Sequence, residues 1–221
     1  MKGTLYGVGV GPGDPELLTL KAIHTIKKCN VIAIPNAGNQ NHVAEKIISD
    51  YIEGKTILAC LMPMTKNKEE LKQKHTEVSE AICEYLEKGQ DVCFVTLGDP
   101  SIYSTYAYIH KRVSEKGYVT KFVPGVPSFC AAAAALNRSL CETEQPLHII
   151  PASYQGDALA LEGSKVFMKA GRGIRDVIET IQERGGEGMM VEKCGMDGEI
   201  IYHSLADVKG EASYFSIVIT D

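Results

Sequence analysis

The chain has 221 residues, of which 44% are hydrophobic, and its formal net charge is −5. This length and apolar content suffice for a buried core in one large domain or two small ones. The acidic balance argues against a broad nucleic-acid-binding face. No apolar run approaches a membrane span and the first residues lack signal-peptide regions, so we expect a cytoplasmic protein without a membrane or nucleic-acid partner.

Metal-ligand spacing is missing from the sequence. Seven cysteines and six histidines are scattered along it, without Cys-x-x-Cys or His-x-x-x-His. An odd number of dispersed cysteines favours reduced thiols. We therefore expect no metal site.

In the first half of the chain, short β-rich runs alternate with longer stretches of helical period. The expected strands are residues 5–10, 31–34, 56–61, 91–96 and 119–123. The expected helices are residues 15–28, with Leu17, Leu18, Leu20, Ile23 and Ile26 inward, then 43–51, 68–87 with Gly89 just past its end, and 101–115. This alternation predicts an α/β domain with a mostly parallel sheet covered by helices.

The segment VPGVPS, residues 123–128, carries two prolines and a glycine, and we place the junction of domains 1–122 and 123–221 there. The second half is expected to contain helices at 129–136 and 174–184, and strands near 147–150, 165–169, 189–192, 200–203 and 214–220. Because the last three strands follow one another without helices, this half is predicted to be α+β with a mixed sheet.

A glycine run, GVGVGPGDP at residues 7–15, stands between the first strand and the first helix. A strand, a glycine-rich turn and a helix N-terminus usually form a ligand cradle, because backbone N–H groups converge and no Cβ blocks close approach. The P-loop is excluded, since no Gly-Lys-Ser/Thr follows, and the spacing also fails the Gly-x-Gly-x-x-Gly dinucleotide fingerprint. The second strand ends at Pro35 and Asn36, without the acidic residue that a Rossmann ribose site needs.

A tight turn with Asp14 as N-cap and Pro15 at the first helical position explains part of this run. A tight turn explains the alternating glycines less well. Glycine destabilises the end of a strand, so a run of glycines there suggests that another group approaches the backbone closely. The same pattern returns at Gly98-Asp99-Pro100-Ser101 after another apolar strand. Both loops are expected at the carboxyl ends of parallel strands, the edge where open α/β sheets bind ligands.

The glycine run and the Gly-Asp-Pro-Ser turn are parts of a wider similarity: the sequence resembles the tetrapyrrole (corrin and porphyrin) methylases, whose methyl donor is S-adenosylmethionine. The resemblance covers nearly the whole chain and rests on GVGPGDPELLTLKA, LGDPSIYST, VPGVPSF, VFMKAGRG, VEKCG and YFSIVI. MKAGR and YFS are most similar to the members that methylate carbon 20 of precorrin-2 or its cobalt complex in cobalamin biosynthesis. Pro35 stands where the uroporphyrinogen branch commonly has Asp, which argues against a uroporphyrinogen substrate.

The resemblance implies two α/β domains with the donor in the cleft between them, S-adenosylhomocysteine as product, and a homodimer. By motif, the donor-contacting positions are Gly11, Pro12, Leu97, Gly98, Asp99, Ile102, Pro127, Ser128, Lys169 and Cys194. Many relatives carry other residues at the last two pairs of motif positions, Pro127-Ser128 and Lys193-Cys194, so backbone contacts are expected there.

The chemistry implied by the resemblance needs alignment and exclusion of water more than an activated side chain, because the meso carbon of a reduced tetrapyrrole is already enamine-like. We assign no general base, and Cys194 has no evident base beside it. A ring with eight carboxylates needs local cations, and the candidates are Lys169, Arg172 and Arg175, with Tyr103 at the flank. Tyr103 and Tyr106 are expected to share one helix face.

Three alternatives remain open. A dinucleotide-dependent oxidoreductase is disfavoured by both failed fingerprints. A non-catalytic tetrapyrrole carrier would bind the ring but not the methyl donor. The third alternative is a methylase of the same family that acts at another position of the corrin ring.

Overall fold

The computed structural model describes residues 1–36, 43–63, 65, 67–151, 154, 156–169, 173–210 and 212–221. The chain divides into two compact units, Met1–Pro127 and Ser128–Asp221, so the division lies at the far end of the VPGVPS segment. Over these described ranges, no helix combines the length and the apolar character that crossing a bilayer requires.

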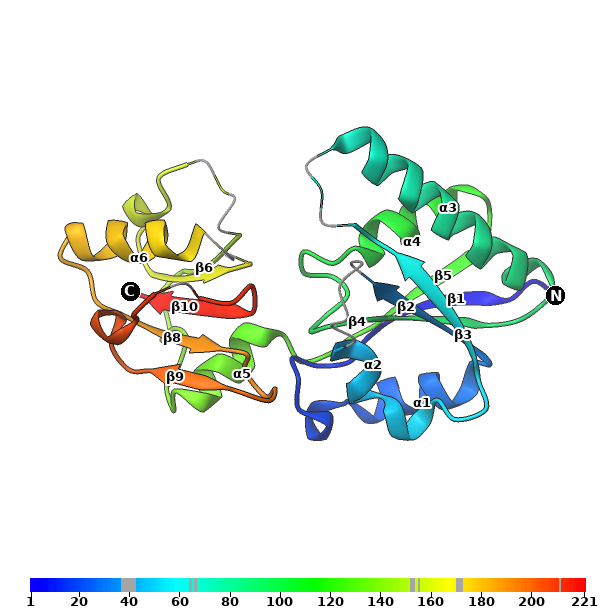
Figure 1. Ribbon diagram of the computed structural model, residues 1–221, viewed down its shortest axis with the longest axis horizontal. Coiled ribbons are helices and arrows are strands. Elements are labelled where there is room, and N and C mark those ends of the chain that lie inside the picture. Colours follow the sequence, from blue (N-terminus) through cyan, green and yellow to red (C-terminus); the bar gives the residue numbers. More distant parts are fainter. Residues whose placement is uncertain are drawn as a thin grey trace. The chain divides into compact units, whose positions relative to one another are not determined.

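A five-stranded parallel sheet in the order β3-β2-β4-β1-β5 forms the centre of the first unit (Figure 1). Its strands are β1 (Thr4–Gly9), β2 (Val31–Asn36), β3 (Thr56–Leu61), β4 (Val92–Thr96) and β5 (Val119–Val123). Strand β4 is buried at all positions, as expected for a strand covered on both faces. The predicted parallel sheet is confirmed.

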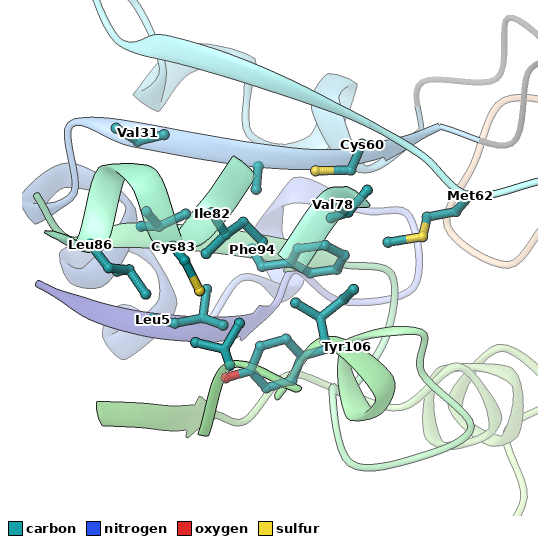
Figure 2. Packing of buried hydrophobic residues seen from close by; sticks show 14 residues of the cluster. Leu5, Val31, Cys60, Met62, Val78, Ile82, Cys83, Leu86, Phe94 and Tyr106 are labelled. Carbon is teal, nitrogen blue, oxygen red and sulfur yellow. The ribbon is translucent and has the colours of Figure 1, made fainter. Parts of the chain in front are cut away.

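Helices cover both faces of this sheet. Two of them, α1 (Leu20–Lys28) and α2 (Val43–Ile47), pack on one face, and α3 (Lys68–Glu87) and α4 (Tyr106–Glu115) pack on the other. Figure 2 shows the second face, where the apolar side chains of α3 and α4 meet strand residues such as Leu5 and Phe94. Removal of this apolar area from water is the main favourable contribution to the fold of the unit.

Helix α3 has the predicted bounds because both of its ends carry strong local signals. The side chain of Asn67 accepts hydrogen bonds from the backbone N–H groups of Glu69 (3.1 Å) and Glu70 (3.3 Å). At the other end Gly89 has φ +75° and its N–H donates to the carbonyl of Leu86 at 3.0 Å. These are an N-cap and a left-handed C-terminal glycine, which end helices at defined residues.

The expected helix at 15–28 is wrong in its first turn. Asp14 caps a short 3₁₀ helix, η1 (Pro15–Leu17), and the chain is extended again at Leu18. Thr19 then begins α1 by accepting a hydrogen bond from the N–H of Ala22 at 3.1 Å. Because the helix is interrupted, Leu20 is 74% exposed instead of inward.

Two further helices are shorter than expected. Residues 43–51 form α2 and a separate 3₁₀ helix, η2 (Ser49–Tyr51). The helix expected from residue 101 begins only at Tyr106, because Tyr103 has φ +46° and the Ser104 hydroxyl accepts from the N–H of Tyr106 at 3.1 Å. Tyr103 and Tyr106 therefore do not share a helix face.

The second unit contains a mixed sheet in the order β6-β7-β10-β8-β9, as predicted. Strands β6 and β7 are parallel, and the other pairs are antiparallel. Helix α6 packs its isoleucines on one face of this sheet, and helix α5 packs against β8 and β10. The elements are α5 (Ser128–Ala135), β6 (Leu147–Pro151), η3 (Ala158–Ala160), β7 (Ser164–Met168), α6 (Ile174–Glu183), β8 (Gly188–Glu192), β9 (Ile200–Tyr202), η5 (Leu205–Asp207) and β10 (Ser216–Thr220).

Candidate functional site

The carboxyl ends of β1 and β4 are neighbours at one edge of the first sheet. The helices that follow them lie on opposite faces, since α1 belongs to one apolar cluster and α4 to the other. Such a reversal is the place where open α/β sheets bind ligands, because the loops diverge beyond the strands. The glycine run and the Gly98-Asp99-Pro100 turn both lie at this edge, as expected.

A backbone bridge joins these two loops. The N–H of Gly98 donates to the carbonyl of Gly11 at 2.7 Å, and the N–H of Gly11 donates to the carbonyl of Gly98 at 3.4 Å. Gly11 has φ +79° and Gly98 has φ +73°. Residues with a Cβ rarely adopt this left-handed conformation, so both positions require glycine for the backbone alone.

The third loop, after β5, packs against the same bridge. A Cβ on Gly9 would lie 2.6 Å from the nitrogen of Gly125 and 2.6 Å from the carbonyl oxygen of Gly98. A Cβ on Gly125 would lie 2.3 Å from that same oxygen. The three loops are therefore in backbone contact through Gly9, Gly98 and Gly125.

Gly7 has a different role in the run. A Cβ there would lie 2.1 Å from the ring of Tyr106, which is fully buried. Packing thus accounts for Gly7 and Gly9, whereas the conformation of Gly11 brings its backbone to the sheet edge. Gly7 and Gly9 therefore need no ligand to explain them, and the ligand cradle stays a prediction for the Gly11 and Gly98 turns.

The Asp99 carboxylate connects two of these loops. Its Oδ1 accepts from the N–H of Ser101 at 2.8 Å and from the Ser101 hydroxyl. Its Oδ2 accepts from the N–H of Gly125 at 3.0 Å. Asp99 is therefore a cap of the turn, as its position after a strand suggested, and also a link to the loop after β5.

The remaining first-unit candidates surround this bridge in sequence and differ in exposure. Pro12 is buried, Leu97 and Ile102 are half-buried, and Tyr103 is 46% exposed in the left-handed turn before α4. Pro127, the last residue of the unit, is half-buried.

In the second unit, Lys169 and Cys194 lie at one edge of the mixed sheet. Lys169 follows β7 and Cys194 lies two residues after β8, and the register pairs Met168 with Ile217 and Glu192 with Ser216. The buried Glu192 carboxylate accepts from the hydroxyl of Ser216 at 3.2 Å and from the N–H of Ser213. The VEKCG and YFS runs are thus joined by a ladder and by a side-chain network.

The pKa values of these two side chains are shifted in opposite directions. Burial, with the nearby Glu199 carboxylate, raises the pKa of the Cys194 thiol to about 12. Cys194 is therefore protonated at neutral pH and lacks the thiolate that a nucleophile needs. Partial desolvation lowers the pKa of Lys169, which has φ +57°.

The residues expected to bind the tetrapyrrole ring are only partly covered by the described ranges. Arg175 is exposed in the first turn of α6, and Arg172 lies outside the described residues. Ser128, a donor candidate, is half-buried at the start of α5. Among the described residues, no group of three His, Cys, Asp or Glu side chains is arranged to hold a metal ion.

A pocket of about 240 Å³ lies in the second unit beside the carboxyl end of β6 and the first turns of α6. Its described walls are mainly apolar, and its charged lining residues are Asp157 and Asp176. The guanidinium of Arg184 pairs with Asp157 at 2.9 and 3.0 Å. The described lining includes no lysine or arginine.

Comparison with known proteins gives these features a context. Residues 4–208 match the family of Tetrapyrrole (Corrin/Porphyrin) Methylases. The chain belongs to this family. The predicted family membership is therefore confirmed.

Two relatives and one solved structure illustrate the similarity of this tetrapyrrole methylase. A Methanocaldococcus jannaschii protein named probable cobalt-precorrin-2 C(20)-methyltransferase is 36% identical, over 97% of this chain and 94% of its own. The Salmonella typhimurium cobalt-precorrin-2 C(20)-methyltransferase is 30% identical, over 100% and 97%. The X-ray structure of a cobalt precorrin-4 methyltransferase superposes with a TM-score of 0.77 at 19% identity, over 98% of this chain and 94% of its own. The last likeness confirms the two-domain α/β fold.

Sequence reasoning missed two residues of this methylase. Gly125 is part of the loop contact, and the VPG segment was interpreted only as a hinge. Glu192 holds the VEKCG and YFS runs together, and the only sequence signal was an acidic residue at the end of an apolar strand.

Proposed function

We propose that this chain is an S-adenosylmethionine-dependent methyltransferase that methylates carbon 20 of precorrin-2, or of its cobalt complex, in cobalamin biosynthesis. The observation that carries the proposal is full-length similarity, at 36% identity, to a relative named for this reaction on a cobalt-precorrin. The MKAGR and YFS runs support the same assignment.

For the donor we propose the carboxyl edge of β1 and β4. S-adenosylmethionine, when bound, supplies an electrophilic methyl group on a sulfonium. The Gly11 and Gly98 turns lie at this edge and bond to each other, and neither glycine carries a Cβ that would cover the backbone there. Pro12, Leu97 and Ile102 would exclude water from this edge. Pro127, Ser128, Lys169 and Cys194 stay predictions for contact with the donor, and Asp99 stays a prediction for the donor site.

For the ring we propose recognition by cations, because eight carboxylates must be held by a chain of net charge −5. Lys169, Arg172 and Arg175 are the proposed partners, with Tyr103 at the flank. The alignment of the ring carbon and the exclusion of water supply the rate enhancement, and no side chain is assigned as general base.

The test is incubation of the purified protein with methyl-labelled S-adenosylmethionine and precorrin-2, with and without cobalt. We expect one labelled methyl group on carbon 20 in the product, located by mass spectrometry and NMR, together with S-adenosylhomocysteine. Label on another ring carbon would contradict the substrate assignment while leaving the family assignment intact. Binding of the ring without donor binding would indicate a carrier, and NAD(P)H binding would revive the oxidoreductase alternative.

A charge test addresses the ring separately. Changing Arg172 and Arg175 together to Gln should raise the KM for the ring and flatten its salt dependence, because several exposed cations acting on one polyanion are screened by salt. Donor affinity should stay the same. An unchanged KM would mean that cationic side chains other than Arg172 and Arg175 bind the carboxylates of the ring. We further propose a cytoplasmic homodimer, for which light scattering of the purified protein tests the dimer.

A further inference from the structure

Gly-Asp-Pro occurs twice at the same sheet edge, and its two aspartates make different hydrogen bonds. Asp14 accepts from the N–H of Glu16 at 2.8 Å, which is a cap within its own turn. Asp99 makes the equivalent bond to Ser101 and a second one, from Oδ2 to the N–H of Gly125. Within the part of the chain that the structure describes, the second aspartate bonds to another loop and the first bonds within its own turn.

The peptide group between Pro124 and Gly125 is held from both sides. Its N–H donates to Asp99 at 3.0 Å, and its carbonyl accepts from the hydroxyl of Thr19 at 3.3 Å. Thr19 is the N-cap of α1, in the segment after β1, and Asp99 follows β4. One peptide after β5 is therefore tied to both neighbouring loops, and the bond to the carboxylate is charge-assisted.

We propose that Asp99 is a positioning residue that holds this peptide, together with Thr19, so that the Gly11 and Gly98 turns are preset for the donor. The inference rests on the proposed function. The carboxylate has three donors on it already, two on Oδ1 and one on Oδ2, and all come from the protein. The Cβ positions of Gly9 and Gly125 meet backbone of the other loops, so their relative placement depends on a few hydrogen bonds and close contacts.

The discriminating variant is Asp99→Asn. An amide has one acceptor oxygen, so either the N–H of Ser101 or that of Gly125 must face an NH₂ group and lose its acceptor. Asp14→Asn is the matched control, since it makes the same change in the same tripeptide without the bond to Gly125. Thr19→Val removes the other bond to the peptide, together with the N-cap bond from the N–H of Ala22, and keeps the shape of the side chain.

The first measurement is amide hydrogen exchange at Gly125. We expect exchange at Gly125 at least about tenfold faster in Asp99→Ala, which keeps neither acceptor oxygen, and unchanged exchange in Asp14→Ala; in Asp99→Asn the amide of Ser101 or that of Gly125 should exchange faster, because one of the two bonds is lost. Equal exchange at Gly125 in wild type and Asp99→Ala would refute the link. This measurement does not depend on any ligand, so it decides the link even if the proposed function fails.

The second measurement is the affinity for S-adenosylhomocysteine, its 2′-deoxy and 3′-deoxy forms, and 5′-methylthioadenosine. A positioning role predicts that Asp99→Asn weakens all four by the same factor, about tenfold. Direct contact predicts a loss only for ligands that keep the contacted group, and this outcome would overturn the proposal. If wild type binds none of the four, the donor assignment itself is wrong.

A double variant completes the test. Because Thr19 and Asp99 hold one peptide, the losses in Thr19→Val and Asp99→Asn should be coupled, and the double variant should lose less than the product of the two factors. Independent, multiplying losses would mean that the two residues act separately and would contradict a shared peptide.

Discussion

Replacing Tyr106 by Phe removes one hydroxyl from the packing of the first unit. The ring is fully buried, lies 5.0 Å from the ring of Phe122, and fills the space above Gly7. Its hydroxyl donates to the carbonyl of Lys121 in β5 at 2.9 Å. Phenylalanine keeps the ring and the buried apolar area, so the change removes this bond and leaves the carbonyl without that donor.

The expected loss is about 1–1.5 kcal/mol in the free energy of unfolding, the usual cost of one intramolecular hydrogen bond. For a chain of this size that corresponds to a decrease of roughly 2–6 °C in Tm. Urea unfolding followed by circular dichroism measures it. The control is Tyr108→Phe in the same helix, whose side chain is 57% exposed and which should change stability by less than about 0.5 kcal/mol. Equal stability of the two variants would refute the packing argument.

Three more outcomes are expected. Gly9→Ala should destabilise the protein by at least about 1–3 kcal/mol in urea unfolding, because its Cβ would lie 2.6 Å from backbone atoms that cannot move cheaply, and an unchanged midpoint would contradict the loop contact. Burial, and then the charge of Arg112, lower the pKa of His75 below 6.5, so the unfolded chain takes up a proton before the folded one does. Stability should therefore be full above pH 6.5 and decrease as the pH falls through that value, and His75→Phe should show a flatter profile between about pH 7.5 and 5.5; parallel profiles would mean that another group titrates. Cys194→Ser should keep kcat within about threefold, since a thiol with a pKa of about 12 is not ionised and is no nucleophile, and any effect should fall on the KM for the donor; complete loss of kcat would assign it a role in the reaction.

Local signals in the sequence predicted most of the first sheet and the long helix α3. Their source is visible at Asn67 and Gly89, where a side-chain cap and a left-handed glycine fix the helix ends without help from distant residues. The family resemblance was also readable, because its motifs are short and local. That both Gly-Asp-Pro turns lie at one edge of the sheet followed from strand direction alone, whereas the neighbouring placement of β1 and β4 did not.

The errors came from contacts that the sequence does not display locally. Leu20 has the right spacing for an inward position, but Thr19 starts a new helix and turns it outward. The start of α4 depends on the left-handed Tyr103 and on Ser104, which also bonds to Thr96 at the end of β4. For the same reason the role of Gly125 was invisible, since its partners are 26 residues away or more.

The contact of Gly9, Gly98 and Gly125 bears on how this fold can change during evolution. A Cβ on Gly9 or Gly125 would strike main chain rather than another side chain, and Gly98 has φ +73°, which residues with a Cβ rarely adopt, so no substitution at the other two can compensate. These three columns of a homologue alignment should therefore be constant together and carry no covariation. Contact inference from correlated substitutions would miss the closest approach of the three loops. A loop graft between relatives should retain all three glycines.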